Sequence, residues 1–258
     1  MNIFVLVKQV PDTETKIRIT ADKAGIEKTD IKWIINPYDE FAIEEALKTK
    51  ERLKEGTVTA VTLGPDRSVE ALRTAVAMGA DNAIHVKTEG EVLDSCLAGR
   101  ALATVLKKEA ASIIFTGKQA IDDDQAAVFG YVAEFLGIPS ASVVVKVEIA
   151  ADKASLKAER EAEGARHVLQ MGLPCLLALD KGINTPRYAS LPGIMKAKKK
   201  EIKGYTLGDL GLSGQSLTVK EADYQLPPER QAGKKLSGDA ATQVKELVKL
   251  LREEAKVV

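Results

Sequence analysis

The 258-residue sequence is poor in the residues that build metal sites, disulfide frameworks and catalytic bases. Its only histidines and cysteines are His85, His167, Cys96 and Cys175. None of them stands in a metal-ligand or Cys-x-x-Cys spacing, so we expect two reduced thiols, no metal site and no histidine-based triad. No catalytic motif brings a nucleophile and a base together. The chain alone is therefore not expected to carry out bond-breaking chemistry.

Long apolar runs and an excess of one charge are also absent. Lys plus Arg and Asp plus Glu each number 37, whereas a dedicated nucleic-acid-binding protein usually has a strong basic excess. No segment approaches the roughly 18 consecutive apolar residues of a membrane span. The N-terminal "MNIFVLVKQV" is too short in apolar residues for a signal peptide and has no cleavage signal. We expect a cytoplasmic location, no nucleic-acid partner and no membrane insertion.

What the sequence does contain is an alternation of strand-like and helical patterns over its first 140 residues. Buried strands are predicted at 3–7, 57–63, 83–86 and 112–117, and helices at 39–54, 69–76, 93–107 and 124–136. This rhythm predicts an α/β fold with a doubly wound, mostly parallel sheet and helices on both faces. It is the Rossmann-like architecture of adenine-nucleotide-binding domains.

The pattern changes in the second half of the chain. Short strands at 143–149, 154–160 and 165–171 predict a small β-meander insertion, and a buried strand returns at 175–180. Residues 203–236 show little periodicity and predict an extended arm, followed by an amphipathic helix at 240–256. We expect a nucleotide-binding domain over 1–183, a partner-recognition loop over 184–202, and a C-terminal arm and helix over 203–258.

The stretch "NTPRYASLPGIMKAKKKEI" (184–202) combines an apolar patch with a basic run outside any regular periodicity. Its apolar residues are Leu191, Pro192, Ile194 and Met195, and its basic residues are Lys196, Lys198, Lys199 and Lys200. A membrane anchor, a nucleic-acid patch and a protein-docking loop are three interpretations. The patch is too small and non-helical for a membrane anchor, and the balanced overall charge argues against nucleic acid. A docking loop is the preferred interpretation.

Four loops lie at the expected carboxyl edge of the sheet, where α/β proteins bind ligands. They cover residues 8–12, 35–40, 63–66 and 117–125. Neither a G-x-G-x-x-G fingerprint nor a P-loop is present, so an anion must be held by backbone N–H groups near 126–130. We expect at least one of Asp122–Asp124 to cap the following helix, with a Mg²⁺ site as a weaker alternative. Phe129 falls at helical spacing with core positions.

Several motifs, in order along nearly the whole chain, resemble one family. They are "VKQVPD", "NPYDEFAIEEAL", "LGPD", "LRTAVAMGAD", "GKQAIDDD" and "PRYASLPGIMKAKKK". The sequence resembles the β subunit of electron-transfer flavoprotein. The resemblance implies a heterodimer with an α subunit, on which the C-terminal arm packs and which holds most of a redox-active FAD. It implies an electron carrier between flavin dehydrogenases, such as the acyl-CoA dehydrogenases of fatty acid β-oxidation, and a membrane quinone reductase. It also implies that Leu191 enters an apolar pocket on the dehydrogenase, followed by the lysines.

The resemblance further implies a nucleotide held by the β subunit itself: a structural AMP, or a second FAD in an electron-bifurcating branch that uses NADH. The implied site is Leu6, Asn36, Pro37, Tyr38, Asp39, Leu63, Gly117, Lys118, Gln119, Ala120, Ile121, Asp122, Asp123, Asp124, Gln125, Ala126, Ala127 and Val128. Tyr38 matches an aromatic position that approaches the flavin held by the α subunit.

The segment "QAAVFGY" (125–131) departs from both branches. Ala126 and Val128 match the bifurcating form, but the bulky Phe129 replaces a glycine that a pyrophosphate would approach closely. A threonine hydroxyl that would serve AMP is also missing. We expect AMP, with the second FAD as the alternative. A non-redox nucleotide-binding domain is a third interpretation.

Overall fold

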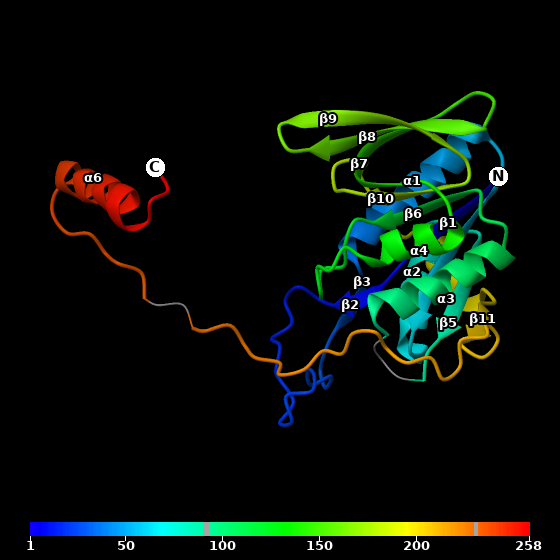
Figure 1. The fold of residues 1–258 in the computed structure, drawn as a ribbon, viewed down its shortest axis with the longest axis horizontal. Helices are drawn as coiled ribbons and strands as arrows, with labels where there is room; N and C mark the ends of the chain where they lie inside the picture. Colours follow the sequence, from blue (N-terminus) through cyan, green and yellow to red (C-terminus); the bar gives the residue numbers. More distant parts are fainter. Residues whose placement is uncertain (90–92, 230–231) are drawn as a thin grey trace. The chain divides into compact units, whose positions relative to one another are not determined.

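The computed structural model describes residues 1–89, 93–229 and 232–258 (Figure 1). The chain forms two compact units. One consists of Met1–Ile17 with Glu27–Ala222, and the other of Arg18–Ile26 with Asp223–Val258. The first unit contains the β-sheet and all of the candidate site and docking residues.

A nine-stranded sheet forms the centre of the first unit, with the order β11-β5-β4-β1-β6-β10-β7-β8-β9 among the described residues. Its strands are β1 (Asn2–Leu6), β4 (Thr57–Gly64), β5 (Asn82–Lys87), β6 (Ile113–Gly117), β7 (Ser140–Ile149), β8 (Ser155–Ala162), β9 (Ala165–Gly172), β10 (Cys175–Leu179) and β11 (Lys203–Thr206). Neighbours from β11 to β7 pair in parallel, and β7, β8 and β9 pair antiparallel. The predicted mostly parallel α/β fold and its β-meander are confirmed.

Helices cover both faces of this sheet (Figure 1). The helical elements are α1 (Pro37–Leu53), the 3-10 turn η1 (Asp66–Ser68), α2 (Val69–Met78), α3 (Ser95–Lys108), α4 (Val128–Leu136), α5 (Leu191–Lys199), α6 (Ala240–Lys249) and the π-helical turn η2 (Leu250–Glu254). Helices α1, α2 and α5 contribute to one apolar cluster, and α3 and α4 to the other. Strand β1 serves both, because Ile3 and Val5 belong to the first cluster and Phe4 and Leu6 to the second.

A two-stranded ribbon that the sequence did not predict lies beside the sheet. Strand β2 (Gln9–Pro11) pairs antiparallel with β3 (Trp33–Ile35). Arg67, which follows β4, stacks on the Trp33 ring at 3.4 Å from its centroid and donates a hydrogen bond of 2.7 Å to Gln9 Oε1. The ribbon therefore ties the segment after β1 to the loop after β4.

Helix α4 begins four residues later than predicted, at Val128 rather than at 124. Its N-cap is Ala127, and no side chain caps it. The prediction that one of Asp122–Asp124 caps this helix is therefore wrong. Residues 121–123 form a turn before the helix and Asp124 follows it, and the carboxylates of the three aspartates bond to other partners.

The segment 184–202 is not the irregular loop that the sequence predicted, since α5 occupies its centre. The helix begins at an N-cap, Ser190, whose side chain accepts a hydrogen bond of 3.1 Å from the Gly193 N–H. Pro192 stands in its first turn, where a missing N–H does no harm. Only Ala197 of the helix is buried, which is why no apolar periodicity indicated it.

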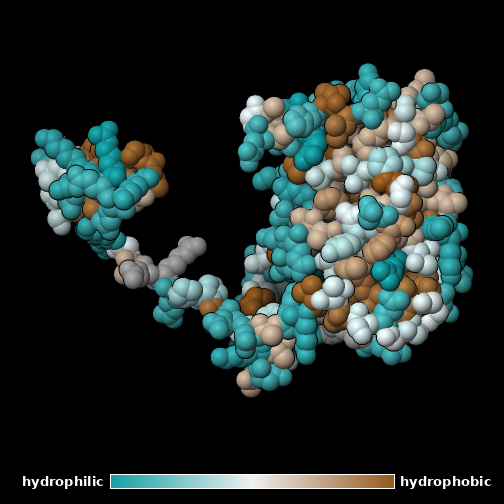
Figure 2. All heavy atoms as spheres, viewed as in Figure 1, coloured by the Kyte–Doolittle hydropathy of each residue, from teal (hydrophilic) through white to brown (hydrophobic). Residues whose placement is uncertain are grey.

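The predicted arm from residue 203 starts instead with β11, and the turn after it inserts Leu210 and Leu212 into the second apolar cluster. In the second unit, α6 is capped by Asp239, which accepts a hydrogen bond of 2.8 Å from the Thr242 N–H. No residue of α6 is buried, and its apolar side chains gather on one side (Figure 2). No helix in the described part of the chain is long and apolar enough to cross a membrane.

Candidate functional site

The carboxyl edge of the sheet has its reversal point at β1. From β1 the chain builds β4 and β5 on one side and then returns to build β6 and β10 on the other. In open α/β sheets this point of reversal leaves a crevice that binds ligands. Lys8 follows β1, and the loop 117–127 follows β6. The two segments that flank the reversal point are thus two of the predicted ligand loops.

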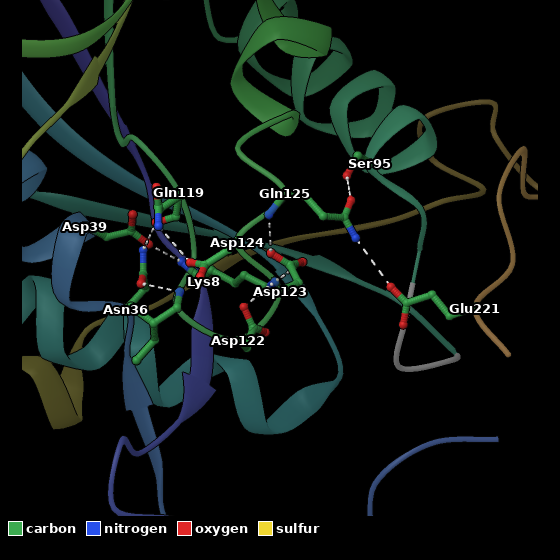
Figure 3. A network of polar contacts seen from close by, with 11 residues as sticks. Lys8, Asn36, Asp39, Ser95, Gln119, Asp122, Asp123, Asp124, Gln125 and Glu221 are labelled. Atoms are coloured by element: carbon green, nitrogen blue, oxygen red, sulfur yellow. Dashed lines mark hydrogen bonds and ion pairs between the residues drawn. The ribbon is translucent and has the colours of Figure 1, made fainter. Parts of the chain in front are cut away.

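Asp39, in the first turn of α1, bonds to the ends of both strands (Figure 3). Its Oδ2 accepts a hydrogen bond of 2.7 Å from the Lys8 N–H, and its Oδ1 one of 3.0 Å from the Gly117 N–H. The residue is only 3% exposed. Burial raises the pKa of Asp39 to about 7, against the opposing effect of the two backbone N–H donors. The carboxyl group therefore fixes the spacing of the two strand ends.

Asn36, the N-cap of α1, makes a second link to the same loop. Its Nδ2 donates to the Gln119 carbonyl at 2.9 Å, and its Oδ1 accepts from the Ile121 N–H at 3.3 Å. Because its side chain serves the loop, α1 has no side-chain cap of its own. The start of α1 thus holds the loop 117–127 at two points.

Part of the negative charge of the acidic turn is balanced from within the site by Lys8 (Figure 3). Lys8 Nζ lies 2.8 Å from Asp122 Oδ1 and 2.9 Å from Asp123 Oδ2, and Asp124 Oδ1 accepts a bond of 2.7 Å from Gln119 Nε2. Burial lowers the pKa of Lys8, but the two carboxylates outweigh that effect and leave it above its usual value. A phosphate near this loop would therefore meet less negative charge than the sequence suggests.

The end of this loop has an unusual backbone and an anchor to other elements. Asp124 and Ala126 both have φ of 49°, a left-handed conformation that is rare outside glycine and is often found at ligand sites. Gln125 accepts a hydrogen bond of 2.6 Å from Ser95 Oγ and donates one of 3.3 Å to Glu221 Oε1. The loop is therefore tied to the start of α3 and to the segment beyond β11.

A cation lies beside the aromatic ring of Tyr38 at the same edge. Lys118 Nζ pairs with Asp180 Oδ2 at 3.0 Å and stands 5.2 Å from the centroid of the Tyr38 ring. Asp180 directly follows β10. Lys118 is thus held beside the Tyr38 ring by a buried carboxylate.

The structure brings all the predicted nucleotide-site residues to this edge, although not all present their side chains there. Leu6, Leu63 and Val128 pack into the second apolar cluster. Phe129 also packs against this cluster but is only half-buried, at its margin rather than in its centre. Lys8, Asp180 and Glu221 were not predicted as site residues. Lys8 stood in a predicted ligand loop, but no sequence signal marked its pairing with residues more than 100 positions away.

At this edge the end of β6 lies very close to the start of α1. A Cβ at Gly117 would lie 2.5 Å from Asp39 Oδ1 and 2.6 Å from Tyr38 Cβ. Polar backbone groups, apolar strand ends and an acidic turn partly balanced by Lys8 are compatible with a nucleotide. In residues 1–89, 93–229 and 232–258, no group of three or more His, Cys, Asp or Glu side chains is placed to hold a metal ion.

The predicted docking residues lie on α5 or directly after it. Leu191 and Met195, together with Tyr188 from the segment before the helix, which was not predicted, are named here the α5 face. The side chains of Tyr188, Leu191 and Met195 are 97%, 80% and 57% exposed. Lys196, Lys198 and Lys199 are also exposed, whereas Lys200 donates a hydrogen bond of 3.2 Å to Asn82 Oδ1. Ile194 is 39% exposed. The opposite side of the helix, with Gly193 and Ala197, packs on α2.

Comparisons with known proteins agree with the motifs. Residues 24–210 match the electron transfer flavoprotein domain family. The chain is 44% identical to the electron transfer flavoprotein subunit beta of Bacillus subtilis, with all of both chains covered. It is 42% identical to the mitochondrial subunit beta of Arabidopsis thaliana, again over both whole chains, and 40% identical to that of Homo sapiens, with 96% of this chain and 98% of the human one covered. The chain therefore belongs to the electron transfer flavoprotein β-subunit family.

Proposed function

We propose that this chain pairs with an electron-transfer flavoprotein α subunit and that the heterodimer carries electrons from flavin dehydrogenases to a membrane quinone reductase. Acyl-CoA dehydrogenases are the proposed donors. The observation that carries the proposal is the α5 face, where Leu191 is 80% exposed on a helix that is itself packed on the sheet domain. Single exposed leucines are common, but Leu191 stands with Ile194 and Met195 as a group of exposed apolar side chains on one helix, and such a group is typical of an interaction site.

The α5 face has the composition of a transient docking site. One apolar side chain gives register and most of the binding energy as a hot spot. The neighbouring lysines increase the rate of encounter with an acidic surface without adding much affinity. We propose that Leu191 enters an apolar pocket rimmed by acidic residues on the dehydrogenase. Such a complex forms fast and dissociates fast, as a carrier requires.

A nucleotide, proposed to be AMP, occupies the crevice between the ends of β1 and β6. Leu6, Asn36–Asp39, Leu63 and 117–128 would hold it, and its role is structural. The FAD held mainly by the α subunit supplies the electron-carrying chemistry when bound. Beside that group this chain would place the Tyr38 ring and the Lys118 ammonium, which is 3.0 Å from Asp180. The ammonium would stabilise negative charge on an adjacent reduced ring.

A second FAD in place of AMP is the alternative, in an electron-bifurcating complex that uses NADH. The placement of Phe129 is compatible with it, because its half-buried side chain packs against the second apolar cluster. Denaturing the purified heterodimer and quantifying the released nucleotides separates the two. One FAD with one AMP supports the simple carrier, two FAD and no AMP support the bifurcating type, and no FAD at all would support a non-redox nucleotide-binding domain.

Docking is tested with Leu191→Ala in the heterodimer. We expect the KM for the heterodimer, as electron acceptor of a reduced acyl-CoA dehydrogenase, to rise at least about tenfold, since hot-spot truncations exceed about 1.4 kcal/mol. FAD content should stay unchanged. Loss of flavin with an unchanged KM would mean that the segment is structural and that the docking assignment is wrong.

A further inference from the structure

The α5 face is held by contacts that lie outside it. Gly193 presses so closely on α2 that a Cβ there would lie 2.3 Å from the Ala77 carbonyl oxygen. Arg73, from α2, donates to the carbonyl oxygens of Ala197 at 2.7 Å and Lys198 at 3.2 Å, which are among the orphan acceptors at the end of α5. The body and the C-terminal end of the docking helix are therefore fixed on α2.

The start of the segment is fixed on a different helix, α1, by Arg187. Its Nε and Nη2 donate to the two carboxylate oxygens of Glu44 at 2.8 and 3.1 Å. Its Nη1 and Nη2 donate to those of Glu51 at 2.8 and 3.3 Å. One guanidinium thus serves two carboxylates in forked geometry, which a lysine cannot reproduce.

Burial makes the Glu44 contact strong. The Glu44 side chain is 4% exposed, whereas that of Glu51 is 58% exposed. Hydrogen bonds to Glu44 and Glu51 hold the pKa of Arg187 above its usual range, so the charge persists at any physiological pH. The Arg187 N–H also donates to Glu44, at 3.2 Å. Both the backbone and the side chain of the residue next to Tyr188 are thereby attached to α1.

We propose that Arg187 is a positioning residue for partner recognition: by bridging Glu44 and Glu51 it fixes the chain that leads into α5 and so pre-organises the α5 face. The inference rests on the docking role proposed above. Pre-organisation lowers the entropy lost when a partner binds, and a small apolar face such as this one has little binding energy to offset that loss. Arg187 need not touch the partner to matter.

The test uses Arg187→Lys in the intact heterodimer, because lysine keeps a positive charge beside the buried Glu44 but loses the fork. Its matched control is Arg166→Lys on β9, where an exposed arginine makes a single 3.5 Å contact with Glu161. We expect the KM for a reduced acyl-CoA dehydrogenase to rise roughly three- to tenfold with kcat unchanged. Amide hydrogen exchange in 184–199 should accelerate by at least a similar factor. The control should change neither quantity.

Two further variants separate the possible failures. Glu51→Gln leaves the buried Glu44 contact in place and should give a smaller change in the same direction, which keeps the test usable if Arg187→Lys lowers the yield of folded protein. The KM change should also persist at high salt, unlike the effect of an exposed lysine such as Lys198. If Leu191→Ala raises the KM but Arg187→Lys and Glu51→Gln leave KM and exchange at control values, the positioning role is refuted and docking stands. If Leu191→Ala has no effect either, the docking proposal fails first.

Discussion

Gly117→Ala should damage the protein more than its small change in volume suggests. The new Cβ would lie 2.5 Å from Asp39 Oδ1, 2.6 Å from Tyr38 Cβ and 2.9 Å from the Tyr38 carbonyl carbon. No real Cβ tolerates such distances, so β6 must withdraw from the start of α1. The withdrawal lengthens the 3.0 Å hydrogen bond from the Gly117 N–H to the Asp39 carboxyl group.

The size of the effect follows from two contributions. Overpacking of a well-packed site costs about 1–3 kcal/mol, and leaving a buried donor or acceptor without its hydrogen bond costs about 1–3 kcal/mol. We therefore expect the free energy of unfolding to fall by roughly 3 kcal/mol and Tm by about 6–12 °C, at the roughly 2–4 °C per kcal/mol of domains this large. The site should also lose affinity for its proposed ligand, AMP, since the loop 117–127 begins at this strand end.

Gly130→Ala is the matched control, assayed beside it by urea and thermal unfolding. Gly130 lies in α4, and a Cβ there meets nothing within 4 Å. Alanine is the better helix former by about 0.5–1 kcal/mol, so this variant should be slightly more stable than the parent protein. If the two variants unfold within about 0.5 kcal/mol of each other, the close contact between β6 and α1 is not what holds this edge together.

Two other perturbations have definite expected outcomes. Burial raises the pKa of Asp39 from 3.8 to about 7, so the folded protein keeps a proton that the unfolded chain loses between those pH values. The stability of the parent protein relative to Asp39→Asn should therefore be highest below about pH 4 and fall by roughly 4 kcal/mol as pH rises through 7; urea titrations that give a flat difference would contradict the burial argument. Leu247→Asp changes a residue of α6 that is 47% exposed, so the stability of the isolated chain should shift by less than about 0.5 kcal/mol. If α6 packs on the α subunit, size-exclusion chromatography should nevertheless show less heterodimer than for Lys245→Ala, and equal assembly would rule out that contact.

The central parallel sheet and the helices that cover it were predictable because most of these elements carry their own local pattern. Strand β1 reads as a continuous apolar run since both of its faces are covered, with Ile3 and Phe4 in opposite clusters. The start of helix α1 is indicated by Pro37 and by the acidic residues Asp39 and Glu40 of its first turn. Such signals depend only on residues that are close in sequence, so a single sequence is enough to detect them.

The start of α4 and the helix α5 were wrongly predicted for two different reasons, distant bonding partners and a lack of apolar periodicity. Asp122 and Asp123 looked like helix caps, but Lys8, more than 110 residues earlier, pairs with both. The cap and proline of α5 were visible in the sequence, yet the helix lies on the surface and has no apolar period to reveal it. The position of a candidate site residue could thus be inferred from motifs, whereas its hydrogen-bond partner could not.

The connection from β10 to β11 gives the docking segment a further property. It leaves the sheet at β10, and it rejoins the sheet at the outermost strand, β11, beyond β6, β1, β4 and β5. Both ends of the segment thus continue into strands of the same nine-stranded sheet, while its outward side chains contribute nothing to the core. The outward residues of such a segment can therefore be substituted without disturbing the core. In a chimaera that keeps Arg187, Gly193 and Ala197, the residues between them would be replaced by those of a relative. With the docking role proposed above, its specificity for dehydrogenases should change while its stability does not.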